Sequence, residues 1–451
     1  MEFIRSRRIV TPQGIREGVI LTQNGLIHSV VSPGEIPAET HGLDVGNSVI
    51  MPGLVDTHVH INEPGRTDWE GFETATKAAA AGGVTTLIDM PLNSTPVTTS
   101  LSSFFTKTKS AEGKCWVDLG FWGGVVPDNQ DQIQPMIEHG IFGFKSFLIH
   151  SGIDDFPSVS ESDLDQVLPL LSEKRIPLLV HAETNAPRSP QSPHPDPRLY
   201  TYFLASRPPD WEDAAIRLLI DLCRKYRSPI HIVHLSWAGA LPLIAQARKE
   251  GLPLTVETCP HYLSFSAEDI PDGRTEFKCC PPIREKRNRE ELWEGLKQGE
   301  IDFIVSDHSP SPPQLKEADS GDFLKAWGGI SSLQLSLSAM WSQAHRRNIS
   351  LSQLTQWMST RPAEFAGLGK RKGKIAPGYD ADLTVWDPEK KFIVDSSRIH
   401  HKHKLTPYTG ETLDGIVQMT FLRGAKIYEH GRFPSDPTGK LLLNERIYAT
   451  H

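Results

Sequence analysis

Eight short apolar runs, each followed by a longer stretch with helical periodicity, constrain the fold of this chain more than any other feature. Buried parallel strands give short continuous apolar runs, and amphipathic helices repeat apolar residues with a period near 3.6. The runs cover residues 48–59, 84–90, 116–126, 143–149, 177–182, 230–235, 252–257 and 301–306, and helical stretches such as 212–224 and 289–297 lie between them. This alternation predicts an α/β fold with a closed (β/α)8 barrel of the TIM type.

Both ends of the chain have a different pattern, in which apolar and polar residues alternate and glycines mark the turns. Residues 18–31 alternate around Gly25, and residues 381–386 and 419–428 alternate around a turn at Arg423 and Gly424. Alternation with period two is typical of strands that bury one face. We expect residues 1–50 and 373–451 to pair into one small β-sandwich domain, with the barrel inserted as residues 51–372. The proline-rich segment 186–197 is expected to be a loop of the barrel.

Composition and charge exclude several classes of function. The chain has 47 Lys and Arg against 55 Asp and Glu, a net charge of −8, which disfavours nucleic acid or a membrane surface as the partner. No run approaches the ~20 apolar residues that span a bilayer. The five cysteines are odd in number and scattered, which is typical of reduced thiols. We expect a small-molecule substrate and a cytoplasmic protein, with an organelle left open for a eukaryotic source.

Potential metal ligands fall at the ends of the predicted strands. His58 and His60 end the first strand, two residues apart, so their side chains share one face. The others are Lys145 in the fourth run, His181 at the end of the fifth, His234 near the end of the sixth, and Asp307 directly after the eighth. Active sites of such barrels lie at the carboxyl ends of the strands, so all six side chains are expected to meet at one mouth. Histidine and carboxylate are ligands that zinc and similar divalent ions prefer.

Each of these residues also has a plainer interpretation. A chain with 18 histidines contains an H-x-H pair by chance quite often, and a single His181 or His234 would more often be a packed core side chain. A buried lysine such as Lys145 is costly unless it is paired, metal-bound or chemically neutralised. Six such residues at six strand ends are difficult to explain by chance, so the set favours a metal site although its members singly do not.

Three further histidines in the same region are weaker candidates for metal ligands. His231 lies three residues before His234, on the opposite face of its strand, which favours packing. His261 follows the seventh strand and is expected to line the mouth without binding metal. His308 follows Asp307 directly and is expected at most to support a ligand.

At these residues the sequence resembles the amidohydrolase superfamily, specifically the cyclic amidases: dihydroorotase, hydantoinase or dihydropyrimidinase, and allantoinase. The matching segments are 52–60 (PGLVDTHVH), 143–145 (GFK), 180–183 (VHAE), 257–263 (ETCPHYL), 280–284 (CPPIR), 306–308 (SDH) and 373–382 (GKIAPGYDAD). The resemblance covers nearly the whole chain.

Within this group the sequence resembles the allantoinases most. Dihydroorotases of this type typically carry, two residues after the second histidine, an arginine that holds the substrate carboxylate, whereas this chain has Asn62. Allantoin has no carboxylate; its ring is a hydantoin with a ureido group. The segments 62–69, 306–310 and 325–330 also resemble those of allantoinases.

The resemblance implies a binuclear metal centre with a bridging hydroxide as the nucleophile. Lys145 would be carboxylated by CO2 to N6-carboxylysine and would bridge two divalent ions, zinc in the first place, with cobalt, manganese or nickel as alternatives. One ion would take His58, His60, Lys145 and Asp307, and the other Lys145, His181 and His234. Asp307 would be the catalytic acid and base.

The implied reaction is the hydrolysis of the cyclic amide bond of allantoin to allantoate in purine breakdown. Asn93 and backbone groups near Cys280 and Gly328 would bind the ring, and relatives imply a homotetramer. A nucleophilic role for Cys280 is disfavoured because no base is apparent beside it. Two alternatives stay open: hydantoinase, dihydropyrimidinase or dihydroorotase activity, and a non-catalytic dihydropyrimidinase-like scaffold.

Overall fold

The computed structural model of the protein describes residues 1–37, 40–185 and 196–444, and its centre is a ring of parallel strands. One sheet contains β6 (Leu54–Val59), β7 (Val84–Asp89) and β8 (Asp118–Phe121). The other contains β9 (Gly123–Gly124), β10 (Phe144–Phe147), β11 (Leu178–His181), β12 (Ile230–Ile232), β13 (Leu254–Thr258) and β14 (Phe303–Ile304). The strand order follows the sequence within each sheet, as expected for consecutive βα units.

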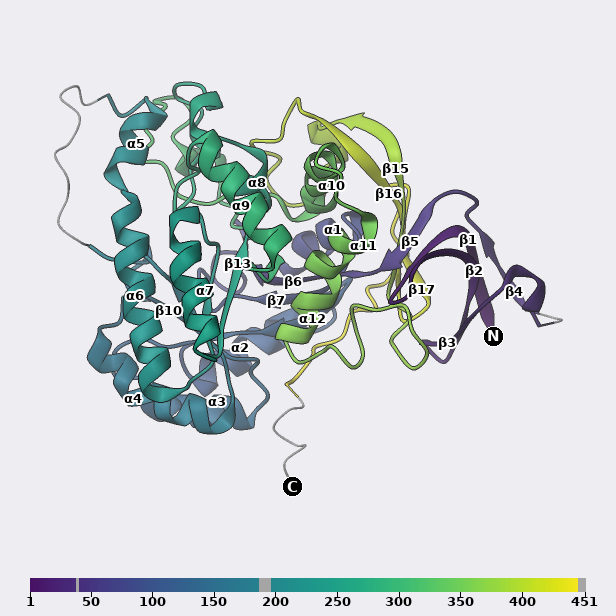
Figure 1. The fold of residues 1–451 in the computed structure, drawn as a ribbon, viewed down its shortest axis with the longest axis horizontal. Coiled ribbons are helices and arrows are strands. Elements are labelled where there is room, and N and C mark those ends of the chain that lie inside the picture. The colour runs from purple at the N-terminus through teal and green to yellow at the C-terminus, as the bar shows by residue number, and fades with distance from the viewer. Residues whose placement is uncertain (38–39, 186–195, 445–451) are drawn as a thin grey trace.

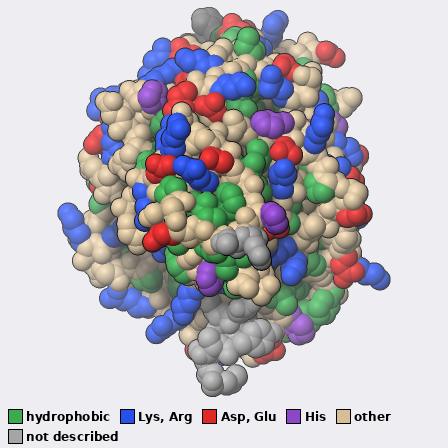
Figure 2. Space-filling model, turned by 90° about the vertical axis from the view of Figure 1, so that its right-hand side faces the viewer, with side chains coloured by type: hydrophobic (Ala, Val, Ile, Leu, Met, Phe, Trp, Pro, Cys, Tyr) green, Lys and Arg blue, Asp and Glu red, His purple; other side chains and the backbone are tan. Residues whose placement is uncertain are grey.

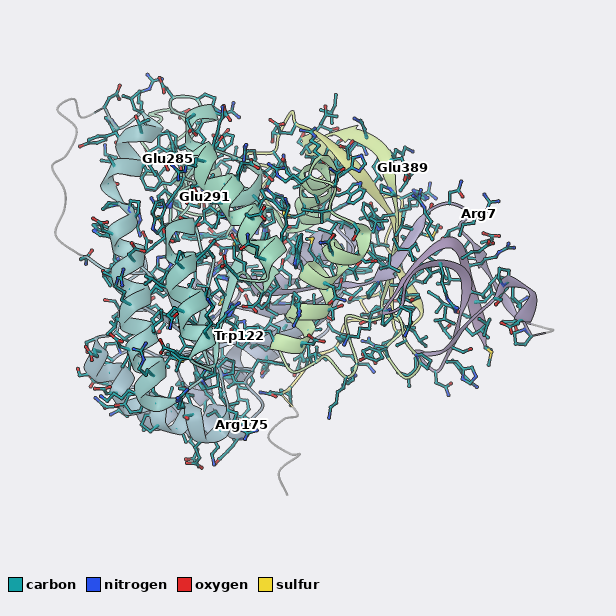
Figure 3. All side chains as sticks on the ribbon, viewed as in Figure 1. Arg7, Trp122, Arg175, Glu285, Glu291 and Glu389 are labelled. Carbon is teal, nitrogen blue, oxygen red and sulfur yellow. The ribbon has the colours of Figure 1, made fainter. Side chains whose placement is uncertain are left out.

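Two junctions turn these sheets into a closed barrel. At the first, β8 continues into β9 across Trp122, so that one length of chain pairs with β7 on one side and β10 on the other. At the second, Val59 forms a parallel bridge with His308, and the His60 N–H donates to the His308 carbonyl at 2.8 Å. The predicted (β/α)8 barrel is therefore confirmed. Trp122 lies fully buried at the first junction (Figure 3), and its Nε1 donates to the Thr57 carbonyl at 2.8 Å.

Helices surround the barrel and bury their apolar faces against it (Figure 1). They include α1 (Phe72–Ala81), α2 (Leu101–Ala111), α3 (Gln130–Glu138), α4 (Glu161–Lys174), α6 (Pro209–Tyr226), α7 (Leu241–Lys249), α9 (Lys286–Gln298) and α10 (Ser336–Arg346). The predicted helices at 212–224 and 289–297 correspond to α6 and α9. In α6, Ala215, Leu219 and Cys223 lie at intervals of four and are fully buried, which is the pattern of a helix packed on one side.

The shorter helices lie in the connections. They are α5 (Tyr200–Ser206), α8 (Pro260–Ser264), α11 (Leu351–Thr355) and α12 (Arg361–Phe365). Within the described residues, no helix combines the length and apolar character that crossing a membrane requires.

The two ends of the chain form one β-sandwich domain beside the barrel, on the right of Figure 1. Its strands are β1 (Glu2–Thr11), β2 (Gly14–Gln23), β3 (Leu26–Val31), β4 (His41–Asp44), β5 (Val49–Pro52), β15 (Leu383–Ile393), β16 (Thr412–Leu422) and β17 (Ala425–Glu429). Strand β5 joins the ends, because it pairs in parallel with β1 and antiparallel with β15. Ile4, Ile20, Ile50, Leu383 and Val385 contribute to its separate apolar core. The exact limits at 50/51 and 372/373 stay predictions.

The end of the molecule formed by this domain carries a mixed surface (Figure 2). Basic and acidic side chains are interspersed there, and hydrophobic side chains gather near the centre of the view. Such a face has no extended field of a single sign.

The structure corrects one predicted strand. Residues 48–59 were expected to form one strand of the barrel, but the chain divides them at Gly53 into β5 of the β-sandwich domain and β6 of the barrel. A Cβ at Gly53 would lie 2.2 Å from Thr85 Oγ1, so only glycine fits where the chain passes between the two sheets. Most of the predicted loop 186–197 lies outside the described residues.

Candidate active site

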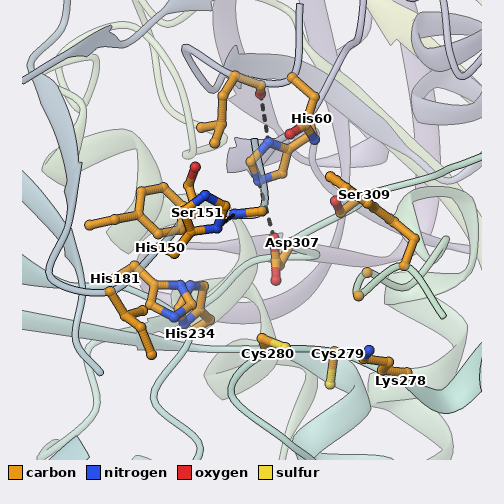
Figure 4. A pocket seen from close by; sticks show the side chains of 18 of the residues that line it. His60, His150, Ser151, His181, His234, Lys278, Cys279, Cys280, Asp307 and Ser309 are labelled. Atoms are coloured by element: carbon orange, nitrogen blue, oxygen red, sulfur yellow. Dashed lines mark hydrogen bonds and ion pairs between the residues drawn. The ribbon is translucent and has the colours of Figure 1, made fainter. Parts of the chain in front are cut away.

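The six predicted metal ligands lie around one cavity of about 510 Å³ at the carboxyl ends of the barrel strands (Figure 4). They come from five places in the barrel: His58 and His60 from β6 and its end, Lys145 from β10, His181 from β11, His234 after β12, and Asp307 after β14. Residues separated by up to 249 positions in the sequence (307 − 58) thus meet at one mouth. The barrel brings them together because parallel strands end on the same side.

The distances within this group suit ligands of shared ions. Asp307 Oδ1 lies 3.2 Å from His58 Nε2 and 3.5 Å from His60 Nε2. The His181 and His234 rings are 4.6 Å apart between centroids, and those of His58 and His234 are 5.4 Å apart. One potential ligand atom from each of His58, His234 and Asp307 lies within 4.8 Å of the others.

Three of the imidazoles direct one nitrogen to the protein, which leaves the other nitrogen for the cavity. His58 Nδ1 lies 2.5 Å from Glu257 Oε1, and His60 Nδ1 lies 2.7 Å from the Leu92 carbonyl. His181 Nε2 lies 2.7 Å from Glu183 Oε2. A hydrogen bond to the second ring nitrogen fixes both the ring orientation and the tautomer, as in most histidine metal ligands.

The carboxylates behind the histidines were not identified from the sequence. Glu257 accepts a second contact from His231 Nε2 at 3.0 Å, and His231 Nδ1 lies 2.8 Å from Thr255 Oγ1. His231 also stacks on Phe303 at 5.2 Å, so it packs as predicted and in addition supports Glu257. Burial raises the pKa of Glu257, but the contacts with His58 and His231 outweigh burial and lower it to about 2. The available signal was its place at the start of segment 257–263, which resembles the cyclic amidases.

Glu183 supports His181 in the way that Glu257 supports His58. Arg207 binds it through two hydrogen bonds, from Nε at 3.0 Å and from Nη2 at 2.6 Å. Burial acts to raise the pKa of Glu183, yet Arg207 and His181 lower it to about 2. The carboxylate is therefore charged, and it orients His181 from a buried position.

Lys145 is the least satisfied side chain in the site. It is fully buried, and its Nζ has no hydrogen-bond partner among the described residues. Burial lowers its pKa to about 7, so the neutral amine is readily populated near neutral pH. A neutral lysine amine is a nucleophile that can combine with CO2, and the product would be an anion suited to bind cations.

These features fit a bound pair of divalent ions. Nδ1 of His234 is also buried without a partner in the described structure, and burial holds the pKa of this residue well below its usual value. Asp307 is held as the carboxylate: burial acts to raise its pKa, but His58 and His60 lower it below the usual range. Neutral imidazoles, an unpartnered amine and a charged carboxylate are a donor set that metal ions bind.

Two of these residues have left-handed backbone conformations. His234 has φ 38° and Asp307 has φ 44°. Non-glycine residues seldom adopt such values, and in folded proteins they concentrate where side chains must be aimed at a ligand. Here they direct side chains from the ends of β12 and β14 into the cavity.

The residues predicted to bind the substrate also line this cavity. Asn93 lies at one side, with its carbonyl accepting a 2.7 Å hydrogen bond from Arg66 Nη1. Cys280 and Gly328 are neighbours, since a Cβ built on Gly328 would be 3.3 Å from Cys280 Sγ. The sequence did not assign a role to several other lining residues: His150, Ser151, Arg207, Lys278 and, at the start of α6, Trp211. Lys325 and Trp327 also line the cavity, and they lie in the segment 325–330 that resembles allantoinases.

The remaining two histidines differ in their roles. His261 is fully buried and is not part of the cavity lining, so the expectation that it lines the mouth is wrong. Helix α8 begins at Pro260 and turns the His261 ring into the interior, where one nitrogen lies within 4.8 Å of Asp307. His308 Nδ1 accepts a hydrogen bond from the Ser332 N–H at 3.1 Å, and its backbone closes the barrel.

Comparisons with known proteins agree with this geometry. The model of the amidohydrolase family matches residues 49–427. An allantoinase from Streptomyces avermitilis is 48% identical over 443 residues, covering 98% of each chain. Allantoinases from Arabidopsis thaliana and Saccharomyces cerevisiae are 46% and 45% identical, over 98% and 95% of this chain and 90% and 95% of theirs.

Solved structures of related enzymes share the fold. The L-hydantoinase (dihydropyrimidinase) from Arthrobacter aurescens has a TM-score of 0.90 and 30% identity, covering 98% of this chain and 99% of that one. A D-hydantoinase (dihydropyrimidinase) from a Thermus species has a TM-score of 0.87 and 26% identity, covering 99% of this chain and 100% of that one.

Proposed function

The chain belongs to the amidohydrolase family, and from this premise we propose that it hydrolyses the cyclic amide bond of allantoin to give allantoate. One observation carries the chemistry: four imidazoles, an unpartnered lysine amine and a charged carboxylate meet in a single cavity. The choice of substrate is supported by relatives named allantoinase that are 45–48% identical over nearly the whole chain.

We infer that the cavity holds two divalent ions, zinc in the first place. One ion would be held by His58, His60, Lys145 and Asp307, and the other by Lys145, His181 and His234, with Lys145 carboxylated on Nζ. When bound, such ions make water a nucleophile near neutral pH and polarise a carbonyl. Glu257 and Glu183 fix the orientation of His58 and His181 on the protein side.

Asp307 moves the proton in the proposed reaction. Its carboxylate points into the cavity and is ionised at neutral pH, so it can accept a proton from the attacking water. The same oxygen would then deliver that proton to the ring nitrogen as the amide bond breaks. Asn93 and the backbones at Cys280 and Gly328 would hold the ring.

Asn62 favours a ring without a carboxylate. Its side chain is fully buried and donates a 3.2 Å hydrogen bond to the Pro310 carbonyl, so this position places no cation in the cavity. A dihydroorotate carboxylate would therefore lack the arginine that dihydroorotases of this type provide here.

A panel of ring substrates tests the proposal. Enzyme reconstituted with zinc in bicarbonate is expected to open allantoin with a higher kcat/KM than hydantoin, dihydrouracil or dihydroorotate. Faster turnover of dihydrouracil than of allantoin would reject allantoin as the substrate. Lys145→Ala, prepared in the same way, serves as the inactive control, because it removes the group that would join the two ions.

The same preparations separate an enzyme from a scaffold. Metal analysis is expected to give about two ions per chain, as a binuclear centre requires. Less than one ion per chain together with no turnover on any ring would favour the non-catalytic alternative. The predicted homotetramer is checked on these samples by sedimentation analysis.

A further inference from the structure

The rim of the cavity next to Cys280 is formed by a segment without regular secondary structure, residues 324–329. Two lysines donate hydrogen bonds to the carbonyl groups of this segment. Lys278 Nζ donates to the Leu324 carbonyl at 3.1 Å and to the Ala326 carbonyl at 2.5 Å. Lys316 Nζ donates to the Trp327 carbonyl at 3.0 Å and to the Gly329 carbonyl.

Both ammonium groups are buried, and this placement is costly. Lys316 is 5% exposed and Lys278 is 7% exposed. Neither makes an ion pair with a carboxylate within the described parts of the chain, so backbone carbonyls replace their hydration. A sequence that needed only packing here would use an apolar side chain of similar length, such as methionine.

Lys316 differs from Lys278 because it connects two backbones. Besides the carbonyls of residues 327 and 329, its Nζ contacts the Lys278 carbonyl at 3.5 Å, two residues before Cys280. The Gly329 N–H donates to that same carbonyl at 2.9 Å. Figure 4 shows Lys278, Cys279 and Cys280 in a row at this side of the cavity. One ammonium group therefore contacts both the backbone that leads to Cys280 and the backbone on either side of Gly328, beside the hydrogen bond that joins them directly.

The segment 324–329 has little room to move relative to Ser309 or Cys280. Gly329 has φ 141°, and a Cβ at this position would lie 2.4 Å from the Ser309 carbonyl oxygen. On the Cys280 side, a Cβ on Gly328 would lie 3.3 Å from Cys280 Sγ. Residues 328 and 329 thus pack closely between Cys280 and Ser309. The hydrogen bonds from the Lys316 ammonium orient the carbonyl groups of Trp327 and Gly329.

We propose that Lys316 is a positioning residue for substrate binding: its buried ammonium sets the spacing of the Cys280 and Gly328 backbones, which hold the ring of the substrate. This inference rests on the proposed function, because it takes the ligand to be a cyclic amide such as allantoin. Lys316 is not a lining residue of the cavity and acts only through these two backbones.

The test is the kinetics of Lys316→Met on allantoin, with the enzyme loaded with zinc in bicarbonate. We expect KM to rise about tenfold, equivalent to one lost hydrogen bond to the ring, and kcat to stay within about threefold. Metal content should equal that of the wild type, because Lys316 contacts none of the six predicted ligands. Lys297→Met, at an exposed lysine near the end of α9, is the matched control and should leave both constants unchanged.

Other outcomes would overturn the proposal. An unchanged KM, or a fall in kcat without a rise in KM, would show that Lys316 does not position a binding surface. Lys316→Gln keeps an N–H donor at this place and should give an intermediate KM. If both variants fail to fold or lose their metal, Lys316 serves the fold rather than the substrate, and the inference is wrong.

The failure of this inference is distinguishable from the failure of the proposed function. If the wild type opens a different ring faster than allantoin, the substrate assignment fails, and the same comparison of Lys316 variants is made on that ring. If the wild type opens allantoin and the KM of Lys316→Met does not rise, only the positioning role is lost.

Discussion

Glu257 divides its two carboxylate oxygens between His58 and His231, and this arrangement shows how single residues build the site. The sequence pointed to His58 and His60 because their spacing on a strand gives both side chains one direction. It placed Glu257 in a segment that resembles the cyclic amidases but could not name its partner, since a glutamate in an apolar run can pair with any nearby cation. Its role follows only from the 2.5 Å contact with His58 across the barrel.

Glu257→Gln tests this supporting role. The amide keeps the shape of the side chain but removes the negative charge that holds His58, so we expect metal affinity to fall about 10- to 100-fold. Competition with a chromophoric chelator measures it. Glu294→Gln, on the exposed face of α9, should leave metal affinity unchanged, and an equal loss in both variants would contradict the role of Glu257.

The division of residues 48–59 into β5 and β6 is the main lesson at the scale of elements. An apolar run shows that a segment is buried, but not which sheet it joins, because neighbouring strands of two sheets give the same pattern. Gly53 is the residue at which the two strands separate. Its N–H donates to the Asp382 carbonyl at 2.9 Å. This bond ties the start of the barrel to the C-terminal part of the chain.

Gly53→Ala should destabilise the fold by about 1–3 kcal/mol, because the new methyl group overlaps Thr85. The free energy of unfolding in urea measures the change. Gly34→Ala is the matched control, since a Cβ there meets nothing within 4 Å and the backbone does not require glycine. Equal stability of the two variants would show that Thr85 moves aside freely.

At the scale of the whole molecule, an ion cluster around Asp118 joins the barrel to three C-terminal segments beside it. Asp118 on β8 has Oδ2 2.9 Å from Lys372 Nζ and Oδ1 2.5 Å from Arg423 Nη1. Arg423 lies in the turn between β16 and β17. It also accepts the Lys440 N–H at 2.9 Å. One carboxylate thus holds three segments that are distant in sequence.

Asp118→Asn should lower the free energy of unfolding by about 3 kcal/mol, because the buried Lys372 and the partly buried Arg423 both lose a charged partner. Burial acts to raise the pKa of Asp118, but Lys372 and Arg423 lower it below its usual value. The stabilisation is therefore present above about pH 4 and is lost as the pH falls through the native pKa. Urea unfolding at pH 7 and at lower pH measures this.

The difference between the wild type and Asp118→Asn should accordingly shrink in acid. A difference that stays constant would show that charge is not the cause. Asp165→Asn, at a surface pair with Lys225, is the control and should have little effect at either pH, since exposed ion pairs contribute little.

The sequence by itself determined the barrel, the pairing of the chain ends and the six candidate ligands, because strand periodicity and strand ends are local properties that residue order records. Tertiary structure decided the rest. Glu183, Lys316 and Glu257 act through partners that are 24, 38 and 199 positions away in the sequence. The buried place of His261 depends on how α8 packs. Such contacts arise from the closure of the barrel in three dimensions, so no local pattern in the chain could specify them.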